Sequence, residues 1–211
     1  MRDALSVAAH HRLTFFAAGL ALFVALAASP ARVALESRMP LHVLAQLPLL
    51  ALAGWWWGKA LPPDFPRWLG PWNRNGVTGL TLVVFTAIFW EMPRSLDGAV
   101  ESAGLELAKF VSLPLGIGLP LALSWPHAPT LLRGFIQAHV LSMLGVLTWL
   151  YSVAPVRLCN NYLIADQEFL GIAFGAIALL LSAVWGGRLF LTPALSDGGL
   201  GIRPSEQRAH P

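Results

Sequence analysis

Charged residues are scarce in this chain, and this scarcity is the first limit on what the protein can be. Aspartate, glutamate, lysine and arginine together make up 12% of the 211 residues, whereas apolar residues make up 56%. A water-soluble domain of this length would lack enough polar surface to cover itself. The composition therefore predicts an all-α, polytopic membrane protein, a bundle of transmembrane helices in contact with lipid.

Cysteine is nearly absent as well. The single cysteine, Cys159, excludes an internal disulfide and any metal or redox motif of the CxxC type. It leaves a free thiol, an intermolecular partner or a ligand for a soft metal as alternatives. The basic residues lie between apolar segments and form no stripe, so we expect no nucleic-acid partner. Nucleophile-elbow, phosphate-loop and zinc-protease motifs are also missing, so we expect no enzyme activity.

Apolar segments long enough to cross a bilayer, roughly 17–25 residues each, recur along the chain between prolines. We expect six of them, at residues 13–29, 41–60, 76–92, 105–125, 131–153 and 169–191. They form one transmembrane domain over residues 1–195, and residues 196–211, which are rich in glycine and polar side chains, are expected to be a flexible tail.

The distribution of basic residues predicts the orientation. An even number of spans puts both termini on one side, and more lysines and arginines fall in the loops of that side than in the opposite loops. The positive-inside rule then places both termini in the cytoplasm. We expect a multi-pass protein of a bacterial inner membrane.

Sulfur and imidazole groups gather at the other end of the predicted helices. Met39 and His42 are three residues apart at the start of the second segment, with Gln46 one turn deeper, and His139 and Met143 are four apart in the fifth. Such spacings put each group on one helix face. Met92 and Cys159 lie at the same depth. Thioether, imidazole and thiolate ligands together select Cu(I), and the sequence therefore predicts a copper site near the extracytoplasmic surface. The alternative is that each methionine fills a gap in the core and the cysteine acts as a small apolar residue.

A second group of polar residues is acidic. Glu91 ends the third segment, and Glu101 and Glu106 precede Lys109, which lies inside the fourth. We expect Lys109 to pair with Glu106 or Glu101, or to extend towards the interface, in preference to a role in proton transfer.

Small residues and prolines predict close packing. The segment from Pro114 to Pro120 is expected to hold a packing kink in the fourth helix. Gly171 and Gly175 form a GxxxG pair that could pack within this chain or against a partner.

Two short windows resemble the CtaG family of cytochrome c oxidase assembly proteins. The first runs from Met39-Pro-Leu-His42 through Gln46, Pro48 and Gly54, and the second contains Asn161-Tyr162, Asp166-Gln167 and Gly171. The resemblance implies a role in copper delivery to, or maturation of, a haem–copper oxidase. It implies functional roles for His42, Asp166 and Gln167 and a thioether ligand at Met39. Gln46 stands where another histidine is expected, and a member that has lost part of its site could persist as a structural subunit.

Three hypotheses follow. In the first, the protein assists assembly or copper metallation of a respiratory oxidase, with Cu(I) held by Met39, His42, His139 and Met143. In the second, it is a non-catalytic accessory subunit of a respiratory or other membrane complex. In the third, His42 and His139 are axial ligands of a b-type haem.

Overall fold

The structure is a computed structural model, and it describes residues 2–62, 65, 70–153, 159 and 161–191. Within these ranges the chain forms helices and no β-strands, which confirms the predicted all-α class. The expected tail at residues 196–211 lies outside the described residues.

The helices follow one another closely. In chain order they are α1 (Arg2–Ala27), α2 (Ser29–Glu36), α3 (Met39–Leu41), the π-helical η1 (His42–Gln46), α4 (Leu47–Ala60), the 3₁₀-helical η2 (Arg74–Gly76), α6 (Val77–Glu91), α7 (Pro93–Glu101), α8 (Ala103–Ser112), the π-helical η3 (Leu113–Gly118), α9 (Leu119–Ser124), the 3₁₀-helical η4 (Trp125–His127), α10 (Thr130–Val153) and α11 (Ile164–Leu191).

Several consecutive helices form continuous apolar segments that are long enough to cross a membrane. Five such spans occur in the described residues, at Ala9–Ala27, Met39–Ala60, Ala103–His127, Thr130–Val153 and Ile164–Arg188, and a sixth is reached if the bent pair Arg74–Glu91 and Pro93–Glu101 is counted as one. The predicted multi-pass membrane architecture is confirmed. The last helix begins five residues before the predicted start of its segment.

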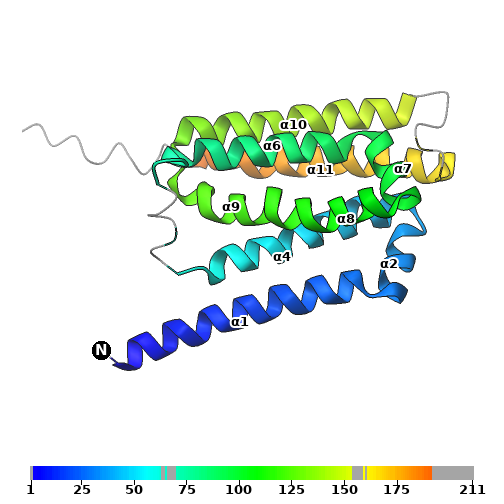
Figure 1. The fold of residues 1–211 in the computed structure, drawn as a ribbon. Coiled ribbons are helices and arrows are strands. Elements are labelled where there is room, and N and C mark those ends of the chain that lie inside the picture. Colours follow the sequence, from blue (N-terminus) through cyan, green and yellow to red (C-terminus); the bar gives the residue numbers. More distant parts are fainter. Residues whose placement is uncertain (1, 63–64, 66–69, 154–158, 160, 192–211) are drawn as a thin grey trace, which may run out of the picture.

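The bend between α6 and α7 was not predicted. The two helices meet at 73°, and Met92 between them has an extended backbone with ψ 128°. Because the ring of Pro93 disfavours a helical conformation in the preceding residue, Met92 ends α6 and α7 starts in a new direction. As a result α7 lies at the same end of the bundle as α2 (Figure 1). We call this end, which holds Glu36, His42, Lys109 and Tyr162, the polar end.

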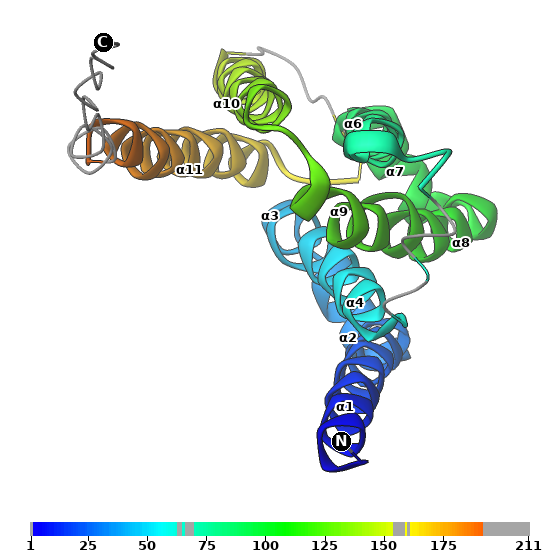
Figure 2. The ribbon, with the colours of Figure 1, turned by 90° about the vertical axis from the view of Figure 1, so that its left-hand side faces the viewer.

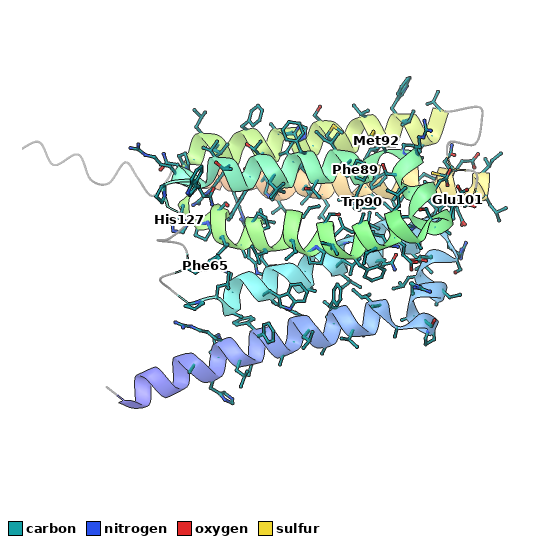
Figure 3. All side chains as sticks on the ribbon, viewed as in Figure 1. Phe65, Phe89, Trp90, Met92, Glu101 and His127 are labelled. Carbon is teal, nitrogen blue, oxygen red and sulfur yellow. The ribbon has the colours of Figure 1, made fainter. Side chains whose placement is uncertain are left out.

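The helices are arranged with α4 between two groups (Figure 2). Helix α1 packs against α4 on one side, while α10 and α11 pack against each other on the other side. The start of α1 and the end of α11 lie at the end of the bundle opposite α2 and α7 (Figure 1). Figure 3 shows Met92 and Glu101 towards the polar end and His127 at the opposite one.

Glycines allow α4 to approach η3 closely. A Cβ atom at Gly118 would collide with the carbonyl oxygen of Ala51, and one at Gly54 would collide with that of Pro114. Neither position leaves room for a methyl group. The proline-rich stretch of the fourth predicted helix is a π-helical segment packed closely against α4.

The GxxxG pair packs inside the chain. A Cβ atom at Gly171 would meet Ser152, and one at Gly175 would meet Thr148, both on α10. The structure therefore decides between the two predicted alternatives in favour of an internal α10–α11 contact.

Replacement of Gly118 by alanine should separate α4 from η3. We expect the free energy of unfolding to fall by about 1–3 kcal/mol, as for other overpacked cores. Gly145 on α10 is the matched control, because no described atom lies within 4 Å of the place that its Cβ would occupy. Gly145→Ala should therefore be neutral or slightly stabilising. Thermal unfolding in detergent measures both, and equal midpoints for the two variants would contradict the close contact.

Candidate functional site

Lys109 is the centre of the polar end. Its side chain is fully buried, and its ammonium nitrogen lies 2.5 Å from Glu36 Oε1, 3.2 Å from Gln46 Oε1 and 3.4 Å from His42 Nε2. Gln46 also donates from Nε2 to Glu36 Oε1 at 3.0 Å. A charged amine in the apolar part of a membrane protein is costly unless it is paired, and this one has a carboxylate and two further acceptors.

These contacts assign the proton on His42. The ammonium has three N–H donors, and the three acceptors around it are Glu36, Gln46 and the Nε2 atom of His42. With Nε2 accepting, the ring proton belongs on Nδ1, which lies 2.7 Å from the hydroxyl oxygen of Tyr162. His42 is therefore a neutral imidazole that links Lys109 to Tyr162.

The π-helical turn η1 presents His42 and Gln46 to the same lysine. Proline at position 48 lacks a backbone N–H group and cannot donate the usual helical bond to residue 44, so the preceding turn is free to widen. Widened turns of this kind are frequent at functional sites. The prediction that His42 and Gln46 share a helix face is confirmed.

Lys109 does not pair as the sequence suggested. Its carboxylate partner is Glu36 at the end of α2, while Glu106 binds Arg32 at 2.6 Å and Glu101 accepts a hydrogen bond from Asn161 at 3.0 Å. The expected snorkelling is also wrong, since no part of the Lys109 side chain reaches solvent. Spacing along one helix predicts ion pairs between residues three or four positions apart. The buried ammonium of Lys109 instead pairs with a carboxylate on a neighbouring helix.

The two windows that resemble the CtaG family meet at the polar end. His42 contacts Tyr162, and Arg38, which directly precedes the first window, forms a salt bridge of 3.1 Å with Asp166. Gln167 beside Asp166 is 3% exposed. Residues that are 120 or more positions apart in the sequence therefore belong to one cluster.

Three of the six predicted metal ligands, Met39, His42 and Cys159, lie in this region. Met39 and Cys159 are buried in one core cluster that also contains Tyr162, the partner of His42. The Cys159 sulfur lies 3.7 Å from the carbonyl oxygen of Pro93. Burial, and then the negative charge of Asp97, raise the pKa of the Cys159 thiol to about 12, so this group stays protonated at neutral pH.

The remaining candidates lie elsewhere. Met92 is 45% exposed at the junction of α6 and α7. His139 and Met143 are half-buried on α10, and Met143 is not among the apolar residues of the core cluster around Tyr162. His139 is close enough to Glu91 for the two side chains to interact electrostatically.

A copper ion would find donors of the right type but not free ones. Both nitrogens of His42 are engaged, Nε2 by Lys109 and Nδ1 by Tyr162, and Cys159 is a thiol and not the thiolate that binds metals. Among the described residues, no group of three or more His, Cys, Asp and Glu side chains is placed to hold a metal ion. The same engagement of His42 opposes its use as an axial haem ligand. In this arrangement the residues do not fit a closed metal site.

Two residues of the cluster were missed as site residues. Glu36 lies on the short helix before the second span, and Tyr162 lies just before α11. Neither residue belongs to a predicted apolar segment, so the comparison of depths within these segments did not include them. The signal that could have found Glu36 is the lysine itself, because a buried ammonium requires a carboxylate. The pKa of Tyr162 is raised by burial and then by the charge of Glu36, which keeps its hydroxyl neutral beside His42.

Comparisons with protein-family models, with characterised proteins and with solved structures gave no match. The resemblance to the CtaG family therefore stays a prediction from the two windows.

Replacing Lys109 by methionine should leave Glu36, whose side chain is 12% exposed, without its counter-ion. We expect the free energy of unfolding to fall by about 3–5 kcal/mol, the usual cost of removing one partner of a buried pair. The double variant Glu36→Gln/Lys109→Met should recover much of this loss, because no charge is then left unpaired. Urea or thermal unfolding in detergent measures the recovery, and additive losses would contradict the coupling between the two residues.

Proposed function

We propose that this chain is a non-catalytic accessory or assembly protein of a haem–copper respiratory oxidase, or of a related redox complex in the bacterial inner membrane. The observation that supports it best is the joining of the two family-like windows at the polar end through the hydrogen bond between His42 and Tyr162. The charged and polar groups that surround Lys109 satisfy one another and form a fixed structure. A fixed surface of this kind is suited to the docking of another protein.

Exposed apolar side chains occur on three segments of the polar end. Val33 on α2, Val100 on α7 and Leu163 before α11 are 62%, 41% and 63% exposed, although they lie outside the five long spans. Exposed apolar groups beyond the lipid-facing helices favour contact with another protein. The excess of basic residues in the opposite loops supports an extracytoplasmic position for this surface.

Purification of the tagged chain from native membranes in mild detergent tests the proposal. The expected result is an oxidase recognised both by its haem spectrum and by the masses of its subunits. The double variant Val33→Asp/Val100→Asp should retain at least about fivefold less oxidase, because it puts charges into the docking surface.

Val77→Asp is the matched control. Val77 is 50% exposed at the opposite end of α6, so the same substitution there should leave the yield of oxidase unchanged. A chain that purifies without any oxidase, together with normal oxidase levels in cells that lack the chain, would refute the proposal.

Copper transfer is the second candidate. It is favoured by the burial of Met39 in one cluster with Cys159 and with Tyr162, the partner of His42, since thioether and thiolate sulfur and imidazole nitrogen are donor types that bind Cu(I). The candidate requires that Lys109 releases Nε2 of His42.

A competition assay with a chromogenic Cu(I) chelator tests this requirement. The double variant Glu36→Gln/Lys109→Met should bind Cu(I) at least about tenfold more tightly than the wild type, because Nε2 of His42 is then free. Adding His42→Ala should cancel the gain, whereas adding Met143→Leu should not, since Met143 lies outside the cluster. If neither wild type nor double variant binds Cu(I) above background, the copper hypothesis is wrong.

A further inference from the structure

An apolar cavity of about 470 Å³ lies between the helices next to the polar end. It is bounded by residues of α4, α6, η3, α9, α10 and α11, whose arrangement is seen when the bundle is viewed from its end (Figure 2). Side chains such as Leu47, Ala51, Ile117, Leu147 and Phe174 line it. The volume falls within the range of binding sites for small organic molecules.

Two polar atoms of the lining have no partner among the described residues. The hydroxyl of Tyr151 and Oε2 of Glu91 are both buried and make no hydrogen bond there. Tyr151 as a whole is only 2% exposed. A buried polar group without a partner costs free energy, and most such groups in proteins are satisfied by something. Both atoms belong to residues that line the same cavity, Tyr151 packs in one core cluster with Leu96, and Glu91 is close enough to Tyr151 for the two side chains to interact electrostatically.

The cavity is elongated. Its lining on η1 and α4 extends from Val43 to Trp55, which corresponds to about 18 Å along a helix. The two polar atoms without a described partner come from α6 and α10, whereas the lining on α4 is largely apolar. One polar headgroup and one apolar tail therefore match the chemistry of the lining.

We propose that this cavity binds a single-tailed amphiphile with an uncharged, oxygen-bearing headgroup, such as a prenyl alcohol or a quinone. The headgroup oxygen accepts a hydrogen bond from Tyr151, and Glu91 contacts the same headgroup. The tail extends along α4 towards Trp55. An anionic headgroup would meet the carboxyl group of Glu91, and a charged group of either sign is costly among apolar side chains.

The two tyrosines of the chain provide a matched test. Tyr151 lines the cavity and its hydroxyl is unpaired among the described residues, whereas Tyr162 is outside the lining and holds His42. Affinities of the purified full-length protein for two probes, farnesol and decylubiquinone, are measured by native mass spectrometry. Tyr151→Phe should weaken binding about three- to tenfold with little loss of stability, as expected for one hydrogen bond. Tyr162→Phe should lower stability but change affinity less than about twofold.

Two further variants test the headgroup and the tail. Glu91→Gln should keep the affinity for both neutral probes within about threefold, because an amide can still hydrogen-bond. Ala87→Phe should abolish binding by filling the cavity where the tail passes. Binding of one probe and not the other, with the same dependence on Tyr151, supports the proposal and identifies the headgroup as an alcohol or a quinone.

Several results would overturn the proposal. These are equal affinities in Tyr151→Phe and wild type, and unchanged binding in Ala87→Phe. Retention of a two-tailed phospholipid or a second copy of the chain that neither probe displaces would also overturn it, because the cavity would then belong to another occupant.

Discussion

A lysine ammonium buried among helices must find an acceptor for each of its three N–H groups, and the polar end is built around this requirement of Lys109. Glu36, Gln46 and His42 meet it, and they come from two different helices. His42 is the third acceptor. Because it accepts at Nε2, its ring proton lies on Nδ1 and is directed to the hydroxyl oxygen of Tyr162. One buried charge thus ties α2, η1, α8 and the start of α11 together.

Much of the fold could be predicted from the sequence because length and hydropathy decide what crosses a bilayer. The apolar segments, the close packing near Pro114 and the helix contact at Gly171 all depend on local composition, and the structure bears them out. The bend between α6 and α7 was missed. It depends on the conformation that Pro93 imposes on a single residue, and a hydropathy profile averages over such a residue.

The candidate site was predicted only in part. Depth along the helices grouped Met39, His42 and Gln46 with His139 and Met143. In the structure His42 and Gln46 contact Lys109, and Met39 packs in the core cluster of Tyr162, whereas Met143 is not among the residues of that cluster. Shared depth does not specify which helices are neighbours. The carboxylate partner of Lys109 is 73 residues away in the chain, beyond the reach of any rule based on spacing along one helix. Both errors arise from tertiary contacts, which sequence periodicity does not encode.

The position of Lys109 in the chain also bears on how the protein is made. Glu36, His42 and Gln46 all precede it, so they have left the ribosome before the fourth span emerges. The lysine therefore enters the bilayer when its counter-ion is already there, which lowers the barrier that an unpaired charge would face. Tyr162 follows only afterwards. The proton on His42 therefore gains its acceptor later than Lys109 gains its counter-ion.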